Sequence, residues 1–235
     1  MTTSTTKARI YTLPNILTVF RMVAAAGVFF ALLFLARNYA YTVALICFFL
    51  ASITDFMDGW IARRFGAESA LGKMLDPIAD KVLIVLTGAA LMTNSSADLG
   101  YVDFTLALSI SLILFREVFV SGVREYLGND YPLPVTWLAK WKTALQMIAF
   151  VLLIVEGILV QSYFMRLAGM DAETANAIIA GSIPDEIGLN FAKTMAEAVY
   201  ILARVVLVSA AAATVITGLN YTARALNYIL GKSSQ

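Results

Sequence analysis

Four aspartates interrupt an otherwise apolar stretch of the chain, and they recur at helical intervals. Asp55 and Asp58 are three residues apart, and Asp76 and Asp80 are four apart, so each pair shares one face of a helix. A charge at the middle of a bilayer costs about 2.5–3.5 kcal/mol on insertion scales, so carboxylates at this depth indicate a site. Oxygen ligands with no histidine or cysteine nearby suit Mg²⁺ or Mn²⁺, and two such ions can bridge a diphosphate. The pattern predicts two divalent ions held by the four aspartates.

Small residues and one arginine accompany these acids. Gly59, Ala62 and Gly72 remove side-chain bulk where a phosphate or a planar base needs close approach to the backbone. Arg63 supplies a fixed cation for phosphate oxygens. The alternative for a single small residue such as Gly59 is packing between membrane helices, which also favours small side chains.

Composition identifies the class of protein. The chain has 235 residues, 60% of them hydrophobic and only 14% charged, with a mean hydropathy of +0.79. These values are typical of integral membrane proteins. A net charge of +1 without a basic patch gives no reason to expect nucleic-acid binding. The sequence contains no histidine, which removes the usual general base, and its single cysteine, Cys47, is expected to be a buried thiol without a disulfide.

Six apolar stretches predict an all-α protein with six transmembrane helices. They comprise residues 16–35, 41–61, 78–92, 104–123, 138–160 and 194–223. We expect the third helix to begin earlier, inside the aspartate segment, with Pro77 in its first turn, where proline is tolerated. Residues 161–193 should form an extended loop with an amphipathic surface helix near 172–180 and a turn at 181–186.

The expected organisation is a polar segment, residues 1–14, followed by a single six-helix domain, residues 15–230. The first span continues well past the length of a signal peptide, so we expect it to be retained without cleavage. Lysine and arginine gather on one side of the predicted helices, which predicts that this side and both termini face the cytoplasm. The basic residues of that side are Lys7, Arg9, Arg63, Arg64, Lys73, Arg124, Lys140, Lys142, Arg224 and Lys232. The opposite side has only Arg37, Arg166 and Lys193. A multi-pass protein of the cell (inner) membrane is therefore predicted, with the aspartates at the cytoplasmic ends of helices two and three.

The aspartates and their neighbours resemble the signature of the CDP-alcohol phosphotransferase family, with no position missing. The matching sequence is Asp55-x-x-Asp58-Gly59-x-x-Ala62-Arg63, then eight residues, then Gly72-x-x-x-Asp76-x-x-x-Asp80. The resemblance implies six transmembrane helices, usually in a homodimer, around a polar cavity that faces the cytoplasm. It also implies transfer of a phosphoalcohol group from a CDP-linked donor to a hydroxyl, with release of CMP. Asp80 would be the general base, and the CDP contacts would include Asp58, Gly59, Ala62, Arg63 and Gly72.

Flanking segments are similar to the phosphatidylglycerophosphate synthase branch of that family. They are residues 13–18 with Arg21, residues 76–81, residues 116–117 with 121–125, and residues 137–143. This similarity implies CDP-diacylglycerol as donor and glycerol 3-phosphate as acceptor, among membrane lipids. It suggests that Asn15 and Thr18 border the nucleotide, with Asn15 as a helix N-cap the alternative. Residues 161–193 look longer than is usual in the branch, which bears on oligomerisation or partners more than on chemistry.

The acceptor phosphate is a dianion and requires cations beyond the metals. The candidates are Arg21, Arg116, Arg124, Lys140 and Lys142. Arg116 and Arg124, eight residues apart, face roughly the same side of a helix, whereas Lys140 and Lys142 point apart, so only one lysine should enter a shared pocket. The alternative for Arg124 and the lysines is anchoring at lipid headgroups.

Acids within the spans suggest ion pairs. An isolated Arg116 would be costly inside a span, and Glu117 and Glu125 are its candidate partners. Glu156 and Arg204 also lie within predicted spans, where a mutual ion pair is possible.

Three other activities compete with this interpretation. The same chemistry could use inositol phosphate, serine or phosphatidylglycerol as acceptor, although a cation cluster favours a phosphorylated acceptor over serine. An intramembrane prenyltransferase would need a second aspartate-rich segment, which the other half of the sequence lacks. A transporter with a divalent-ion site would place its carboxylates between internal repeats, and none is evident.

Overall fold

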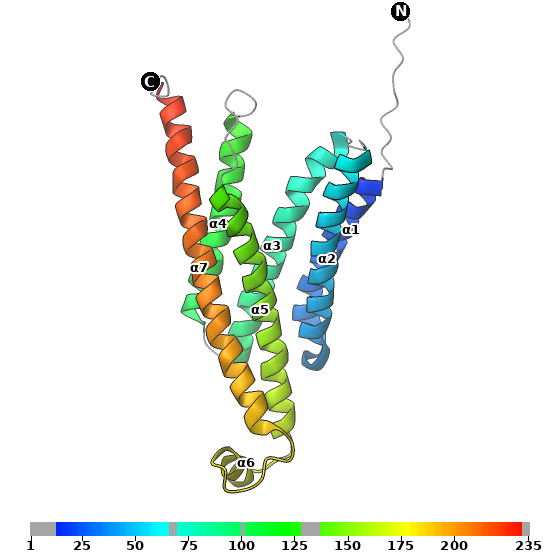
Figure 1. Ribbon diagram of the computed structural model, residues 1–235, viewed down its shortest axis with the longest axis vertical. Helices are drawn as coiled ribbons and strands as arrows, with labels where there is room; N and C mark the ends of the chain where they lie inside the picture. The colour runs from blue at the N-terminus through cyan, green and yellow to red at the C-terminus, as the bar shows by residue number, and fades with distance from the viewer. Residues whose placement is uncertain (1–12, 66–69, 100–101, 128–136, 232–235) are drawn as a thin grey trace, which may run out of the picture. The chain divides into compact units, whose positions relative to one another are not determined.

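The computed structural model describes residues 13–65, 70–99, 102–127 and 137–231, without the side chains of some residues inside these ranges. Every regular element in these ranges is an α-helix, which confirms the all-α prediction (Figure 1). The helices are α1 (Leu13–Phe34), α2 (Arg37–Phe65), α3 (Ala70–Leu99), α4 (Phe104–Leu127), α5 (Trp137–Leu167), α6 (Ala172–Ile179) and α7 (Leu189–Ile229). They form two compact units, Met1–Ala90 and Leu91–Gln235, each of which is described by itself.

Five of the described helices are long and apolar enough to cross a membrane: α1, α2, α4, α5 and α7. Together with the composition, they make the chain an integral membrane protein. α3 is not among these five, and the charged residues Asp76, Asp80 and Lys81 lie in its first half.

In the first unit, α1 and α2 pack along each other, joined by a short connection after Phe34 (Figure 1). Their contact relies on small side chains, including Ala25 and Ala44, both fully buried. A Cβ added to Gly27 would lie 3.1 Å from the sulfur of Cys47, so the two helices approach closely there. Cys47 is a free thiol and only half-buried, which corrects the expectation of full burial.

The expectation that Pro77 lies in the first turn of its helix is wrong. α3 begins at Ala70, which places Pro77 inside the helix. Proline at an interior position lacks the N–H that would bond the carbonyl four residues earlier. The apolar window starting at residue 78 marked only the most hydrophobic part of α3, because a helix can continue into polar residues that hydropathy does not detect.

In the second unit, α7 packs along α5 and also against α4 (Figure 1). α7 has 41 residues, and α5 reaches Leu167, so both exceed the predicted spans. Much of the expected 161–193 loop is therefore helical, and only residues 168–188 connect the two helices. The predicted surface helix is confirmed as α6, and the turn after it includes Gly181, whose φ of 75° lies in the left-handed region that glycine adopts readily.

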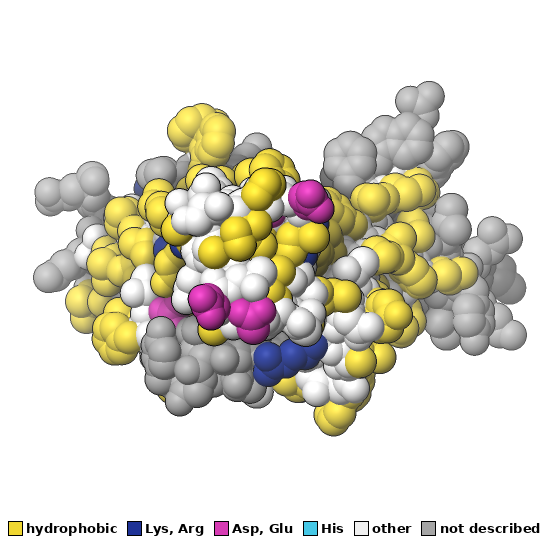
Figure 2. Space-filling model, turned by 90° about the horizontal axis from the view of Figure 1, so that it is seen from below, with side chains coloured by type: hydrophobic (Ala, Val, Ile, Leu, Met, Phe, Trp, Pro, Cys, Tyr) yellow, Lys and Arg dark blue, Asp and Glu magenta, His cyan; other side chains and the backbone are white. Residues whose placement is uncertain are grey.

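Acidic side chains cap the helices of this connection. Asp171 accepts a 2.8 Å hydrogen bond from the backbone N–H of Thr174, which lowers the pKa of Asp171. Desolvation acts to raise the pKa of Asp185, but N–H groups at the start of α7, including that of Leu189 at 2.7 Å, bring this pKa below its ordinary value. Figure 2 views this end of the molecule from below and shows acidic side chains among mostly uncharged ones.

Candidate active site

Three of the four predicted metal ligands belong to the described part of the first unit. Asp55 lies on α2, and Asp76 and Asp80 lie on α3. The helical backbone of α2 continues to Phe65, so it keeps the predicted spacing through Asp58. The side chains of Asp58, Gly59, Ala62 and Arg63 lie outside the described residues. Gly72 is described and is buried on α3.

A buried polar face of α1 accompanies these aspartates. Asn15, Thr18 and Arg21 follow one another at intervals of three residues and are 4%, 0% and 1% exposed. Three residues at this spacing lie toward one side of a helix, so α1 turns this polar face to the protein interior in its first half, while Ala25 and Val28 are buried further along. Asn15 lies inside α1, which already includes Leu13, so the interpretation of Asn15 as an N-cap is wrong.

Arg21 brings together aspartates from two different helices. Its Nη1 atom lies 2.8 Å from Oδ1 of Asp55 and 2.6 Å from Oδ1 of Asp80. The two carboxylate oxygens therefore cannot be farther apart than these two distances combined. The Asp55 and Asp80 side chains remain 49% and 60% exposed, so they present a surface that a charged ligand can reach. Binding of the acceptor phosphate by Arg21 stays a prediction, because its guanidinium is engaged by the predicted metal ligands.

Thr18 makes the corresponding contact with the third aspartate. Its hydroxyl donates a 2.8 Å hydrogen bond to Oδ1 of Asp76. All three described aspartates thus receive a hydrogen bond or an ion pair from the polar face of α1. That Thr18 borders the nucleotide stays a prediction, and the structure shows its hydroxyl orienting Asp76.

The described residues fit a divalent ion by the chemistry of their donors. Asp55 and Asp80 offer carboxylate oxygens that already converge on one cationic group, and oxygen-only sets suit Mg²⁺ or Mn²⁺. No cluster of three or more acidic, histidine or cysteine ligands was found among the described side chains, which do not include that of Asp58. The four-aspartate metal site stays a prediction, and Asp55 and Asp80 are the two of its residues that meet at one cationic group.

A second polar cluster lies in the second unit, at the predicted acceptor cations. Lys142 on α5 donates a hydrogen bond to Oε1 of Glu117 on α4, and Nη1 of Arg116 lies 3.6 Å from the same oxygen. Glu117 is therefore the partner expected for Arg116, while Glu125 is exposed. Lys142 is only 4% exposed, so its interpretation as a headgroup anchor is wrong.

One lysine of the pair is thus confirmed to point into the protein, while the side chain of Lys140 lies outside the described residues. The cluster continues from Lys142 to the next turn of α5. Gln146, 1% exposed, donates a 3.1 Å hydrogen bond to Oγ1 of Thr214 on α7 and lies 3.4 Å from Glu117. Hydrogen bonds therefore link α4, α5 and α7 at this level.

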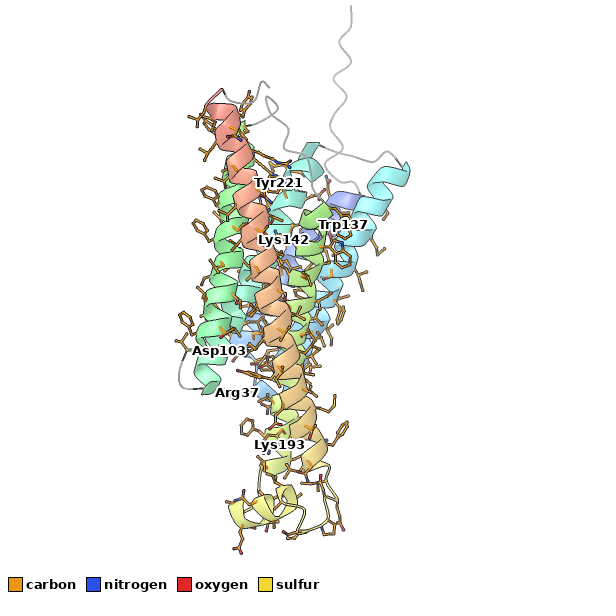
Figure 3. The ribbon with its side chains drawn as sticks, turned by 60° about the vertical axis from the view of Figure 1, so that its left-hand side comes forward. Arg37, Asp103, Trp137, Lys142, Lys193 and Tyr221 are labelled. Atoms are coloured by element: carbon orange, nitrogen blue, oxygen red, sulfur yellow. The ribbon has the colours of Figure 1, made fainter. Side chains whose placement is uncertain are left out.

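Tyr221 on α7 contacts both arginines of α4. Nη2 of Arg124 donates a 3.0 Å hydrogen bond to the Tyr221 hydroxyl. The guanidinium carbons of Arg124 and Arg116 lie 4.9 and 5.6 Å from the centre of the ring. The prediction that Arg116 and Arg124 face the same side of their helix is thereby confirmed. Figure 3 shows Tyr221 and Lys142 toward one end of the second unit, with Asp103 and Lys193 toward the other.

An ion network of three charges occupies that other end. Arg204 on α7 pairs with Glu156 on α5 at 2.8 Å and with Asp103 at 2.9 Å. The expected Glu156–Arg204 pair is confirmed. Asp103, which also accepts a 3.0 Å hydrogen bond from the N–H of Leu106, ties the start of α4 to the same arginine.

Sequence reasoning missed Gln146, Thr214, Gly218 and Tyr221. The spacing of these residues in the sequence could have revealed them. Gln146 follows Lys142 by four residues, and on α7 Gly218 follows Thr214 by four residues and precedes Tyr221 by three. Each set therefore shares a helix face. Polar residues at helical spacing within an apolar span indicate an interior-facing surface, and this pattern could have been found.

Comparison with known proteins identifies the family. The model of the CDP-alcohol phosphatidyltransferase family matches residues 11–174, which include all four aspartates. A Cereibacter sphaeroides protein named CDP-diacylglycerol–glycerol-3-phosphate 3-phosphatidyltransferase is 41% identical over 221 residues, covering 93% of this chain and 97% of that protein.

Relatives of the same name occur in other lineages. The Rickettsia bellii protein is 42% identical over 143 residues, which span 60% of this chain and 74% of that protein. An Arabidopsis thaliana protein whose name adds "1, chloroplastic/mitochondrial" is 35% identical over 154 residues, or 63% of this chain and 52% of that protein. The extent of the family match shows that this chain belongs to the CDP-alcohol phosphatidyltransferase family.

Proposed function

We propose that this protein transfers the phosphatidyl group of CDP-diacylglycerol to glycerol 3-phosphate, producing phosphatidylglycerophosphate and CMP. A relative named for this reaction is similar over nearly the whole chain. The structural observation that supports the proposal most is the meeting of Asp55 and Asp80 at Arg21. It joins carboxylates from the two halves of the family motif at one cationic group.

Asp55, Asp58, Asp76 and Asp80 would hold two Mg²⁺ or Mn²⁺ ions. When bound, such ions polarise the diphosphate and neutralise charge on the departing CMP. Asp80 is the candidate general base, by analogy with the family, and its carboxylate would accept the proton of the attacking hydroxyl. The acceptor oxygen forms a bond to the phosphorus next to diacylglycerol as the bond from that phosphorus to the CMP oxygen breaks.

The nucleotide would be held by the small residues of the motif and by the buried face of α1. Gly72 is buried, as expected of a residue that permits close packing or close approach. The remaining proposed contacts to CDP are Asn15, Thr18, Asp58, Gly59, Ala62 and Arg63.

The acceptor phosphate would be bound by Arg116, Arg124 and Lys142, with Lys140 and Arg21 as further candidates. Burial supports Arg116 and Lys142, and Arg124 faces the same side of α4 as Arg116. Lys142 and Arg116 are largely shielded from solvent, and cations held in such surroundings bind a dianion more strongly than surface cations do. A phosphorylated acceptor makes use of this charge, whereas serine would not.

We propose that the chain spans the inner membrane six times, with α3 added to the five helices named above. Both termini would lie in the cytoplasm, and the aspartates would lie at the cytoplasmic side of the membrane. The bias of lysine and arginine toward one side supports this orientation. Thr2→Cys and Glu173→Cys, each in a Cys47→Ser background, test it in intact spheroplasts. An impermeant thiol reagent should label only the Glu173→Cys variant, and labelling of the Thr2→Cys variant alone would reverse the orientation.

The family resemblance also suggests a homodimer. Sedimentation of the purified protein in a density-matched detergent should give the mass of two chains. A single-chain mass that retains full activity would contradict this part of the proposal.

The decisive experiment measures CMP release from labelled CDP-diacylglycerol by the purified full chain. Glycerol 3-phosphate, inositol phosphate, serine and phosphatidylglycerol are compared as acceptors, each with Mg²⁺, with Mn²⁺ and with EDTA. We expect release with glycerol 3-phosphate that EDTA abolishes. Faster release with another acceptor would reassign the substrate, and no release with any acceptor would eliminate the transferase proposal.

A further inference from the structure

Tyr221 is the point at which two arginines of α4 meet one side chain of α7. The residue is 3% exposed, its hydroxyl accepts a hydrogen bond from Arg124, and its ring lies within 5.6 Å of both guanidinium carbons. Arg116 and Arg124 carry like charges that repel each other, so this arrangement needs a stabilising partner.

An aromatic ring stabilises cations differently from a carboxylate. The ring attracts a guanidinium through its quadrupole, and the phenol oxygen accepts a hydrogen bond, but neither carries a formal charge. Glu117 provides the contrast, because its carboxylate carries a negative charge that is paired with Lys142 and lies 3.6 Å from Nη1 of Arg116. Tyr221 therefore orients two arginines without placing a further negative charge beside them.

Gly218 leaves room for the side chain of Arg116 against the backbone of α7. A Cβ added to Gly218 would lie 2.9 Å from Cγ of Arg116, closer than non-bonded carbons can approach. The apolar stem of Arg116 therefore rests directly on the backbone of α7, about one helical turn from Tyr221. The absence of a side chain at position 218 and the ring at position 221 together fix how Arg116 lies against α7, while its Nη1 atom faces Glu117.

We propose that Gly218 and Tyr221 are positioning residues that hold Arg116 and Arg124 for the phosphate of the acceptor alcohol and add no negative charge beside them. The inference rests on the proposed function, in which these arginines bind the acceptor. It assigns part of acceptor recognition to α7, a helix that lies outside the matched residues 11–174.

The test is steady-state kinetics of the purified full chain with both substrates varied. Tyr221→Leu should raise the KM for glycerol 3-phosphate about tenfold, since it removes a cation–π contact and a charged hydrogen bond. Tyr221→Phe keeps the ring and should cause a smaller rise, of about threefold. The KM for CDP-diacylglycerol should change less than about twofold in both variants.

The Tyr221→Glu variant separates the effect of added negative charge on acceptor binding from the effect of lost contacts on stability. A glutamate can still pair with both arginines, so the folded protein should melt no lower than Tyr221→Leu. It neutralises positive charge, however, and should raise the KM for glycerol 3-phosphate more than Tyr221→Leu does. A KM close to that of the wild type in Tyr221→Glu would overturn the inference, as would equal changes in both KM values in Tyr221→Leu. Gly218→Ala should raise the acceptor KM selectively, and an unchanged value would remove Gly218 from the proposal.

Tyr200→Leu is the matched control. Tyr200 also lies on α7 and stacks on an arginine, with the Arg204 guanidinium carbon 4.4 Å from its ring centre. Its loss should leave the KM for glycerol 3-phosphate unchanged. A similar rise in this control would show a general effect of weakening α7 and would overturn the inference.

The effect of inorganic phosphate on the melting temperature tests the inference separately from the proposed function. Phosphate should raise the melting temperature of the wild type and of Tyr200→Leu, and this shift should be lost in Tyr221→Glu. The measurement needs no turnover, so it remains informative if glycerol 3-phosphate proves not to be the acceptor. Equal protection of all three proteins would overturn the inference.

Discussion

Thr18 on α1 donates a 2.8 Å hydrogen bond to Asp76 on α3, which lies 58 residues later in the chain. Thr18 is fully buried, whereas Asp76 is exposed, so a rigid donor holds an accessible carboxylate. Residues that orient metal ligands typically change metal affinity or activity about 10–100-fold when they are replaced. Loss of the Thr18 hydroxyl should therefore weaken metal binding at Asp76.

Thr18→Val removes the hydroxyl and keeps the branched shape. We expect the Mg²⁺ or Mn²⁺ concentration for half-maximal activity to rise about tenfold, because Asp76 loses its orienting donor. Thr18→Ser, which restores a hydroxyl, should stay within about threefold of the wild type, since it can make the same hydrogen bond. A metal titration of both variants checks this, and identical curves for the two would refute the role of the hydroxyl.

Arg21→Met leaves two nearby carboxylates without their shared cation. We expect the free energy of unfolding to fall by about 2 kcal/mol in EDTA, a value reduced by the partial exposure of both acids. A divalent ion can take over the lost charge, so millimolar Mg²⁺ or Mn²⁺ should restore much of the melting temperature. Thermal unfolding in detergent measures both effects, and a deficit that the metal does not reduce would argue against an ion between Asp55 and Asp80.

Asp80→Asn should abolish transfer while leaving the protein folded. The amide keeps the size of the side chain but cannot accept a proton as a carboxylate does, and it is a poorer ligand for Mg²⁺. We expect a loss of activity of about a thousandfold or more. Glu197→Gln is the control, because Glu197 is an exposed acid whose oxygen is 3.9 Å from Lys193. Turnover by Asp80→Asn at the wild-type rate would remove Asp80 from the mechanism.

Arg204→Met should damage stability more than chemistry. It leaves Asp103 and Glu156, whose side chains are 11% and 14% exposed, as buried acids without their cation. Removing one partner of such a network typically costs about 3–5 kcal/mol. Unfolding in detergent should show this loss, whereas the acceptor KM of the folded fraction should equal that of the wild type. Mg²⁺ should not restore the stability of this variant, in contrast to Arg21→Met.

Low pH should loosen the connection around α6. The pKa values of Asp171 and Asp185 are lowered in the folded state, so their contribution is complete above the ordinary carboxyl pKa of about 3.9. It is lost as the pH falls through the lowered folded-state values. The protection of the amides of residues 168–190 from hydrogen exchange, taken relative to the intrinsic rate at each pH, should therefore fall below about pH 4 in the wild type. Asp171→Asn and Asp185→Asn should each flatten this pH dependence, and an unchanged profile in both would refute the prediction.

The aspartate motif was predictable because its chemistry is local in sequence. Spacing of three and four residues placed Asp55, Asp76 and Asp80 on helix faces, and the cost of charge in a membrane marked them as functional. Their shared contact with Arg21 was not predictable, since no pattern within α1 specifies which distant carboxylates it meets. The same holds for Asp103, whose place before α4 indicates a cap but not its pairing with Arg204.

Helix lengths were predicted least well, for a physical reason. Hydropathy detects the part of a helix that suits lipid, so its apolar stretches begin at Ile78 in α3 and at Thr194 in α7. The expectation that the third helix begins earlier, inside the aspartate segment, is confirmed by its start at Ala70. Helical structure continues where intrahelical hydrogen bonds are satisfied, whether or not the side chains are apolar. Pro77 was misplaced for the same reason, and the correct boundaries turned much of an expected loop into helix.

The contact of Asp103 with Arg204 aligns the beginning of α4 with the interior of α7. The 15 residues of α7 that precede Arg204 therefore extend past the start of α4, with the last turns of α5 beside them (Figure 1). At 1.5 Å per residue, this extension is about 22 Å long. This extension places α6 beyond the start of α4. A fluorescent label or an antibody fragment attached at α6 would consequently be held at a distance from the cation cluster, which makes α6 a suitable handle for imaging this small enzyme.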